Sequence, residues 1–288
     1  MRRFLLLIAF VLTVQSSAAA VKVSSMTAKT DSWRSVAVKG RLGFTIYLPA
    51  GYDSSGLRYP VVYFLHGLPA DPGTFQTASW VANALEATGM NAILVVPQAT
   101  RSASDDPEYH DWGPGSNWET ALAVELPAYV DAHYRTIMSR NGRALVGISA
   151  GGYGAAILGF HHLAKFGVIE SWSGYFRPTD PTGKDTLDVG SDADNAYASV
   201  HVLATKLAKQ IWRSSLFFAF YIGASDPTFV ADNKTLDREL SAAKLTHVFA
   251  VYPGGHTTAL WASHASRWLA MALNHLEPAQ ASAAITAK

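Results

Sequence analysis

The sequence predicts an α/β protein with a mostly parallel central sheet, helices on both faces of the sheet and an N-terminal antiparallel hairpin. From residue 60 onward, short apolar runs of strand length alternate with longer segments of helical periodicity, which is the pattern of consecutive βαβ units. The runs are apolar at nearly every position, as expected for strands buried on both faces. Ahead of them, Lys39-Gly40-Arg41 separates two further runs and gives a hairpin signal.

The composition is that of a globular protein with a large core. Of the 288 residues, 49% are hydrophobic, and 23 Lys and Arg residues nearly balance 22 Asp and Glu residues. A chain of this length can form one large α/β domain, and we assign residues 33–277 to it. The balanced charge and the lack of a long basic run argue against nucleic acid as a partner.

The first 20 residues have the pattern of a Sec-type signal peptide. Arg2 and Arg3 precede an apolar run over residues 4–14, and Ala18-Ala19-Ala20 supplies small residues for cleavage near Ala20. A membrane anchor is the alternative, but this run is short for a span, and no later stretch is long enough. We therefore expect a protein that is secreted or held in the cell envelope, with residues 21–32 as a flexible lead-in. The sequence has no cysteine, so it can form no disulfide.

Each expected strand is an apolar run bounded by proline, glycine or a polar cluster. In chain order, the strands cover residues 33–38, 42–48, 61–65, 92–96, 145–148, 168–172, 216–222 and 247–251. Apolar residues at helical spacing predict helices over residues 74–88, 153–160, 196–210, 229–245 and 258–276, and another that Asn117 caps and Pro127 interrupts. Residues 100–116 and 176–195 are expected to be loops, and residues 278–288 a disordered tail.

The segment Leu145-Val146-Gly147-Ile148-Ser149-Ala150-Gly151-Gly152 matches a nucleophile elbow. In that motif a strand turns sharply into a helix through Gly-x-Ser-x-Gly, so that the serine hydroxyl stands clear of the backbone. Side chains two residues before and after the serine would collide, and glycine at both positions removes the collisions. The same pattern also fits a glycine-rich turn without catalytic function.

A general base and an acid follow the serine in the order that a catalytic triad on this type of sheet requires. Asp226 comes shortly after the expected strand 216–222, and His256 after the strand 247–251. Carboxyl ends of parallel strands meet at one edge of a sheet, so we assign Ser149, Asp226 and His256 as the catalytic residues. Taken singly, Asp226 also fits a turn or helix cap, and His256 a solvated loop residue.

The oxyanion hole is assigned to two backbone N–H groups. One is that of Ala150, directly after the serine, and the other that of Leu68, in the loop after strand 61–65. Pro69 has no N–H to donate. We expect His66 to be structural. No metal or other cofactor is expected, because no spacing of ligands stands out and the adjacent His161 and His162 diverge on a helix.

Several segments together resemble the esterase D, or putative esterase, family of α/β-hydrolases. They are Tyr47-Leu48-Pro49-Ala50-Gly51-Tyr52, residues 59–67 and the blocks around the three triad residues. The family includes S-formylglutathione hydrolases, feruloyl and acetylxylan esterases, and secreted mycolyltransferases. Asn117-Trp118-Glu119-Thr120 and Trp261 are similar to the mycolyltransferases, which however carry Glu in place of Asp226 and Trp in place of Thr258. The resemblance implies an α/β-hydrolase fold over residues 33–275.

The function expected from these residues is that of a secreted serine esterase that works through an acyl-enzyme. The alternative is an acyltransferase that passes the acyl group to a sugar or lipid alcohol, so the partner is a small-molecule, glycan or lipid ester. An inactive binding protein on the same fold, and a serine peptidase, rank below these. We assign substrate binding to Trp118, Tyr175 and Trp261, although such aromatic side chains also serve as core.

Overall fold

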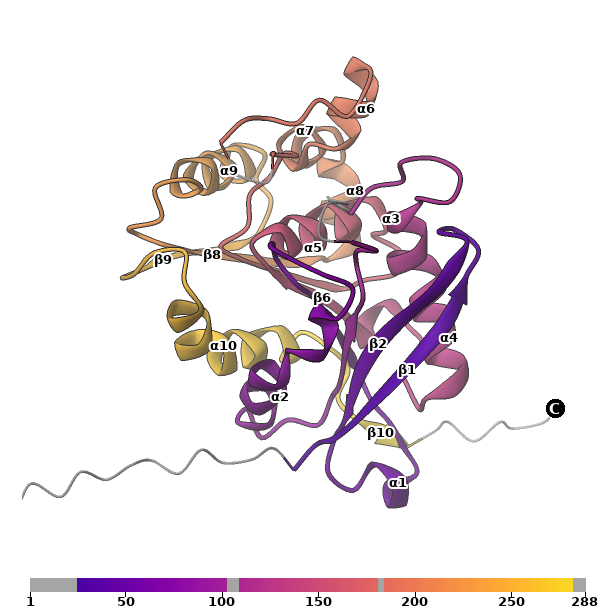
Figure 1. Ribbon diagram of the computed structural model, residues 1–288. Coiled ribbons are helices and arrows are strands. Elements are labelled where there is room, and N and C mark those ends of the chain that lie inside the picture. The colour runs from indigo at the N-terminus through magenta and orange to yellow at the C-terminus, as the bar shows by residue number, and fades with distance from the viewer. Residues whose placement is uncertain (1–24, 103–108, 181–183, 282–288) are drawn as a thin grey trace, which may run out of the picture.

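The computed structural model describes residues 25–102, 109–180 and 184–281, and the chain forms one eight-stranded sheet with helices packed against it (Figure 1). The strand order is β1-β2-β5-β4-β6-β7-β8-β9. The strands are β1 Thr27–Ser35, β2 Gly40–Leu48, β4 Val61–Leu65, β5 Ile93–Pro97, β6 Arg143–Ile148, β7 Val168–Trp172, β8 Phe217–Gly223 and β9 Val248–Tyr252.

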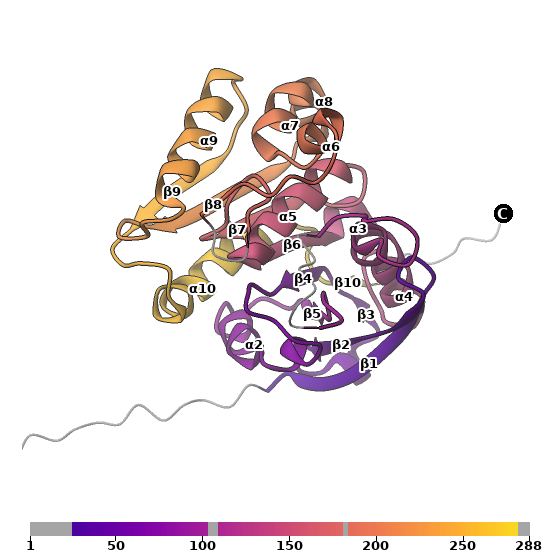
Figure 2. The ribbon, with the colours of Figure 1, turned by 45° about the horizontal axis from the view of Figure 1, so that its top comes forward.

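The sheet is parallel from β5 to β9 and antiparallel where the N-terminal hairpin joins it. β1 pairs with β2 along nine residues, from Thr27 opposite Leu48 to Ser35 opposite Gly40, and β2 pairs antiparallel with β5. Figure 2 shows this hairpin closing one edge of the sheet and β9 forming the other. The predicted fold class, with its antiparallel hairpin, is confirmed.

One boundary of the hairpin differs from the prediction. Residues 27–32 are not a flexible lead-in but the first part of β1. Their side chains are exposed or half-buried at this edge of the sheet, so the sequence there has no apolar run. Backbone pairing with β2, rather than burial, forms the strand.

The helices also follow the predicted order, with several differences. They are α1 Tyr52–Ser55, η1 Thr74–Gln76, α2 Ser79–Glu86, α3 Trp118–Thr120, η2 Ala121–Glu125, α4 Leu126–His133, η3 Arg140–Gly142, α5 Ala150–His161, α6 Asp192–Tyr197, α7 Val200–Lys206, α8 Ala208–Ser214, α9 Val230–Ala242 and α10 Thr258–Leu273. The helix predicted over 74–88 is η1 followed by α2, and that over 196–210 is divided among α6, α7 and α8. α6 begins at Asp192, inside the expected loop 176–195, because Ser191 and Asp194 form a capping box there. The short α1 and η3 were not predicted. Before Pro127 the chain forms a π-helical turn, η2, because proline has no N–H for the preceding turn.

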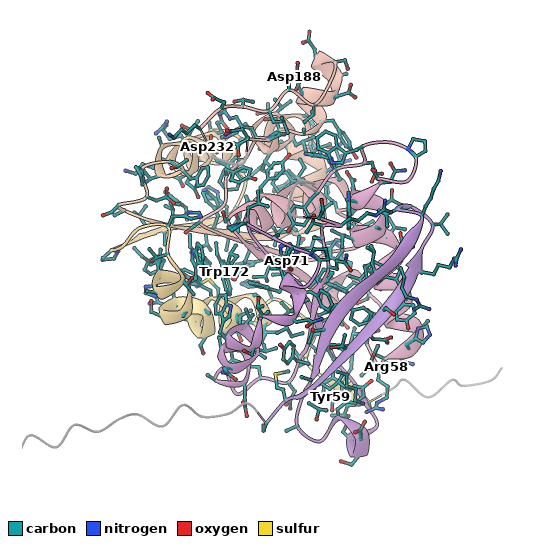
Figure 3. All side chains as sticks on the ribbon, in the orientation of Figure 1. Arg58, Tyr59, Asp71, Trp172, Asp188 and Asp232 are labelled. Atoms are coloured by element: carbon teal, nitrogen blue, oxygen red, sulfur yellow. The ribbon has the colours of Figure 1, made fainter. Side chains whose placement is uncertain are left out.

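Two apolar layers sandwich the sheet. Side chains of alternate residues on one strand enter different layers, so Val62 and Phe64 of β4 face α2 and α10, while Tyr63 and Leu65 face the layer that contains α5, α7 and α9. Trp172 belongs to the first layer and packs on Trp268 of α10 at a ring-centroid distance of 5.2 Å (Figure 3). Both faces of the sheet are therefore covered.

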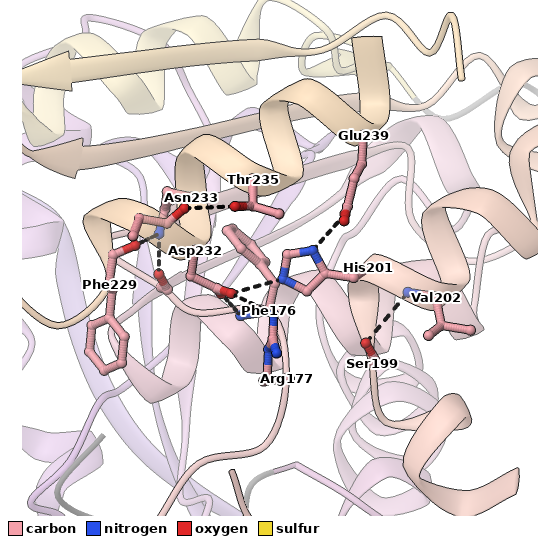
Figure 4. Close-up of polar contacts among 12 residues, drawn as sticks. Phe176, Arg177, Ser199, His201, Val202, Phe229, Asp232, Asn233, Thr235 and Glu239 are labelled. Carbon is pink, nitrogen blue, oxygen red and sulfur yellow. Dashed lines mark hydrogen bonds and ion pairs between the residues drawn. The ribbon is translucent and has the colours of Figure 1, made fainter. Parts of the chain in front are cut away.

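A partly exposed cluster of ionisable groups joins α7 to α9 (Figure 4). The imidazole of His201 lies between two carboxylates of α9, with Nδ1 2.6 Å from Glu239 and Nε2 3.0 Å from Asp232. Asp232 also accepts a hydrogen bond from the backbone N–H of Phe176 and forms an ion pair with Arg177. We call these groups the His201 clamp, and they tie both helices to the segment that follows β7.

The described part of the C-terminal segment contributes to a second, two-stranded sheet. β10 Gln280–Ala281 pairs antiparallel with β3 Leu57–Arg58, so the prediction of a disordered tail is wrong for these two residues. This pairing again uses backbone groups and leaves the side chains exposed. The predicted signal peptide and residues 282–288 lie outside the described residues. In the part of the chain that the structure describes, no helix is both long and apolar enough to span a bilayer.

Candidate active site

Ser149 lies at a tight turn between β6 and α5, as the elbow motif predicts. Its backbone is in a strained conformation, with φ 53° and ψ −121°. The turn is so close that a Cβ on Gly147 would lie 2.1 Å from the carbonyl oxygen of Gly151, and one on Gly151 would lie 2.1 Å from that of Leu65. Only glycine fits at these two positions.

The structure brings the three predicted catalytic side chains into one hydrogen-bonded chain. His256 Nε2 is 2.9 Å from Ser149 Oγ, and His256 Nδ1 is 2.8 Å from Asp226 Oδ2. Ser149 follows β6, Asp226 follows β8 and His256 follows β9, so three separate strands position them. These strands lie in one parallel block, and their carboxyl ends share an edge of the sheet.

Asp226 is held as an anion. Its carboxylate is fully buried, and its Oδ1 accepts hydrogen bonds from the backbone N–H groups of Thr228 and Phe229, each at 3.0 Å. Burial by itself raises the pKa of Asp226, but the hydrogen bonds from His256 and from these N–H groups outweigh it and hold that pKa below its ordinary value. An ionised Asp226 keeps the Nδ1–H of His256 pointing toward it and leaves Nε2 free to accept a proton.

The loop after β4 passes directly beside the serine. A Cβ on Gly67 would lie 2.9 Å from Ser149 Cβ, so this close approach also requires glycine. Leu68 follows Gly67 in this loop, and Ala150 is the first residue of α5. The two predicted oxyanion donors thus belong to segments on either side of Ser149.

A cavity of about 150 Å³ with both apolar and polar lining residues opens at Ser149. Its walls include the side chains of Phe64, Trp80, Ile148 and Trp261, together with the Leu68 loop. The ring of Trp261 stands edge-on to His256 at a centroid distance of 5.1 Å, and its indole N–H donates to Ser173 Oγ at 2.9 Å. Trp261 thus lines the cavity at Ser149, and its role in substrate binding stays a prediction.

The other two aromatic residues assigned to substrate binding lie elsewhere. Trp118 is 4% exposed and belongs to the core on the α5 side of the sheet. Tyr175 is 3% exposed, stacks on Tyr153 and packs against Phe229, which in turn contacts the ring of His256 at 5.4 Å. Neither lines the cavity at Ser149. Phe64 and Trp80 do, but no sequence pattern separates these two residues from aromatic residues of the core.

The remaining histidines of interest are engaged in structural contacts. His110 is buried, with Nε2 2.6 Å from the hydroxyl of Tyr153. His161 and His162 both contact the carboxylate of Glu119, at 3.0 and 2.9 Å, so the expectation that they diverge is wrong: α5 ends at His161, and His162 has left the helical conformation. Within residues 25–102, 109–180 and 184–281, no group of three or more His, Cys, Asp or Glu side chains is arranged to hold a metal ion.

The mostly parallel sheet and the serine elbow define an α/β-hydrolase. A family model described as putative esterase matches residues 35–269, and the chain belongs to this family. The family resemblance predicted from the sequence is therefore confirmed.

Three similar proteins illustrate the relationship. An esterase of Mycobacterium tuberculosis is 31% identical over 239 residues, which are 74% of this chain and 52% of that protein. Diacylglycerol acyltransferase/mycolyltransferase Ag85A of Mycobacterium gordonae is 28% identical over 157 residues, which are 51% of this chain and 44% of that protein. A solved ferulic acid esterase has a TM-score of 0.75 at 23% identity and covers 87% of this chain and 98% of its own. The chain spans about half the length of the curated relatives it matches.

Proposed function

We propose that this protein is a serine carboxylic-ester hydrolase that works through an acyl-enzyme. The observation that carries the proposal is the hydrogen-bonded chain from Ser149 through His256 to buried Asp226, at the mouth of a cavity. A serine hydroxyl is a weak nucleophile until an adjacent base removes its proton, and this arrangement supplies that base. Membership of the putative esterase family supports the same reaction.

The reaction proceeds in two stages. Ser149 Oγ attacks the ester carbonyl carbon while its proton passes to His256 Nε2, and the carbonyl oxygen becomes an oxyanion facing the N–H groups of Ala150 and Leu68. The ester C–O bond then breaks, and His256 gives the proton to the departing alcohol. Water, deprotonated by His256, attacks the acyl-serine in the same way and releases the acid.

The cavity at Ser149 supports a small apolar acyl group. Aromatic and aliphatic side chains line much of it beside the polar His66, Thr74 and Thr77, and its volume of about 150 Å³ leaves room for a short chain or one small aromatic acid. Similarity to a ferulic acid esterase is in keeping with such an acid.

A second candidate is transfer of the acyl group to a sugar or lipid alcohol. The similarity to the acyltransferase/mycolyltransferase of Mycobacterium gordonae favours it. Water and alcohol compete for the same acyl-enzyme, so the two activities share Ser149 and differ in the acceptor.

We further propose that the protein acts outside the cytoplasm, because residues 1–20 have the pattern of a signal peptide. N-terminal sequencing of exported protein tests this, and an intact Met1 in that protein would contradict it.

The test of the activity uses nitrophenyl esters of increasing acyl length with purified wild type and Ser149→Ala. We expect hydrolysis that favours short acyl groups, and a loss on the order of 10⁶-fold in kcat for the variant, as a triad serine gives in a well-studied hydrolase. Ser214→Ala removes another serine hydroxyl, from α8, where it bonds the carbonyl of Ile211, and should retain full activity. Hydrolysis unchanged in Ser149→Ala would refute the proposal. Acylated sugar formed on adding a sugar acceptor would establish the transferase.

A further inference from the structure

Two carbonyl groups of the loop after β4 are hydrogen bonded inside the protein. The hydroxyl of Tyr109 donates to the carbonyl oxygen of His66 at 2.5 Å. The carbonyl oxygen of Gly67 lies 3.1 Å from His66 Nδ1. Because a carbonyl can only accept, the Nδ1 atom carries the hydrogen of this contact. Two consecutive peptide groups ahead of Leu68 are therefore fixed by side chains.

Peptide geometry carries this restraint to the proposed oxyanion donor. In a planar trans peptide the N–H points away from the C=O of the same group. The carbonyl of Gly67 and the N–H of Leu68 belong to one peptide, so the hydrogen bond from His66 sets the direction of that N–H. Tyr109 fixes the preceding peptide, whose far end is Gly67, the residue packed against Ser149. Rotation of either peptide would move the Leu68 N–H relative to Ser149.

Tyr109 is itself held firmly. Its side chain is fully buried, and its φ of 57° is in the left-handed region, which a tyrosine adopts only where surrounding contacts maintain it. Its ring lies against α5 so closely that a Cβ on Gly154 would be 2.4 Å from a ring atom. The ring thus spans the distance between the Leu68 loop and the helix that begins directly after Ser149.

We propose that Tyr109 is a positioning residue for the oxyanion hole. Its hydroxyl holds the carbonyl of His66 so that the N–H of Leu68 faces the oxyanion of the tetrahedral intermediate. This role rests on the proposed function, because it requires that an oxyanion forms at Ser149. Tyr109 itself does not touch the substrate and acts through the loop.

The test is Tyr109→Phe, which removes the hydroxyl and keeps the ring. Removing one oxyanion donor costs about 10²–10³ in kcat, and a donor that is displaced but present should cost less. We expect kcat for nitrophenyl acetate to fall about 10- to 100-fold while KM changes little. Affinity for a boronic acid, whose serine adduct places an oxygen in the oxyanion hole, should fall by a similar factor. The affinity for acetate as product should stay at the wild-type value.

Tyr59→Phe is the matched control. It also removes a buried tyrosine hydroxyl, which lies 2.6 Å from Ser55 Oγ, but from the other end of β4 (Figure 3). It should lose a comparable amount of stability with kcat and boronate affinity unchanged. If Tyr109→Phe does not fold, Gly154→Ala is the second variant. It retains the hydroxyl of Tyr109 but displaces the ring, and with it the hydroxyl, from the carbonyl of His66. The same selective loss in kcat is expected.

The outcomes separate this role from the proposed function. Turnover that depends on Ser149 but is unaffected in Tyr109→Phe overturns only the role of Tyr109, and so does a loss that lies in KM alone. A Gly154→Ala protein with wild-type kcat and boronate affinity also overturns it. Absent turnover in the wild type, or turnover that survives Ser149→Ala, overturns the proposed function and the role of Tyr109 with it.

Discussion

Asp226 is the residue on which the state of the proposed base depends. It is buried and ionised, and it holds the Nδ1 side of His256. In Asp226→Asn the amide can present an N–H to that nitrogen and select the tautomer that cannot accept the serine proton. We expect kcat to fall about 10⁴-fold, as the same change does in a serine protease, with little change in KM. Steady-state kinetics with a nitrophenyl ester measures this.

Asp237→Asn is the control for Asp226→Asn. Asp237 Oδ1 is also paired with a histidine, 3.0 Å from His247 Nε2, but this pair is not part of the proposed site. Its kcat should equal that of the wild type. Full activity in Asp226→Asn would show that another acid orients His256.

At this scale the sequence predicts that Ser149, Asp226 and His256 lie together, because each follows its own apolar strand, and the structure places their side chains in hydrogen-bond contact. It does not separate Trp261, which lines the cavity, from Trp118, which is core, since both are aromatic residues in helices. No sequence pattern predicts the role proposed for Tyr109. Its contact with His66 is one side-chain hydrogen bond across 43 positions, and no local spacing encodes such a contact.

Among the elements, α7 and α9 are held together by the His201 clamp. Burial lowers the pKa of His201, but hydrogen bonds and charge from Asp232 and Glu239 raise it more, so the net shift is upward. A group whose pKa rises on folding stabilises the fold fully at pH values below its unfolded pKa, and this contribution is lost as the pH rises through the folded pKa. We expect His201→Gln to lose about 1–3 kcal/mol of unfolding free energy at pH 6 and less at pH 9. Urea unfolding at both pH values measures the difference.

His133→Gln is the comparison for the clamp. The ring of His133 is exposed and bonds the carbonyl oxygen of Tyr129 instead of a carboxylate. Its unfolding free energy should stay within about 0.5 kcal/mol of the wild type at both pH values. A His201→Gln loss that is the same at pH 6 and pH 9 would contradict the assignment of a charged His201.

The ends of helices and strands can be predicted from the sequence where buried positions form an apolar run. The buried strands β4, β5, β6, β7 and β8 begin and end within two residues of the apolar runs that predict them. The first half of β1 and the short β10 were not predictable, because their backbone groups pair while their side chains face solvent. The division of 196–210 among three helices was also missed, because apolar periodicity continues across the breaks.

For the whole molecule, two apolar layers share a single sheet, and this predicts one cooperative unfolding transition. Leu158 of α5 lies in one layer and Leu269 of α10 in the other, and both are fully buried. Replacing either leucine with alanine leaves a cavity that costs about 2–5 kcal/mol. We expect each variant to lower the temperature of the same transition in calorimetry. Two separate transitions, each sensitive to one variant, would show that the layers unfold independently.

The pairing of β10 with β3 has a practical consequence for handling the protein. β3 precedes β4 in the chain, whereas the Leu68 loop follows β4, so residue 281 is anchored near the end of the sheet opposite Ser149. Figure 1 shows β10 at the lower end of the ribbon. A reporter domain or surface attachment joined after this residue would therefore emerge far from the cavity. Immobilisation through that end would leave the mouth of the cavity open to bulky esters, whatever the size of the support.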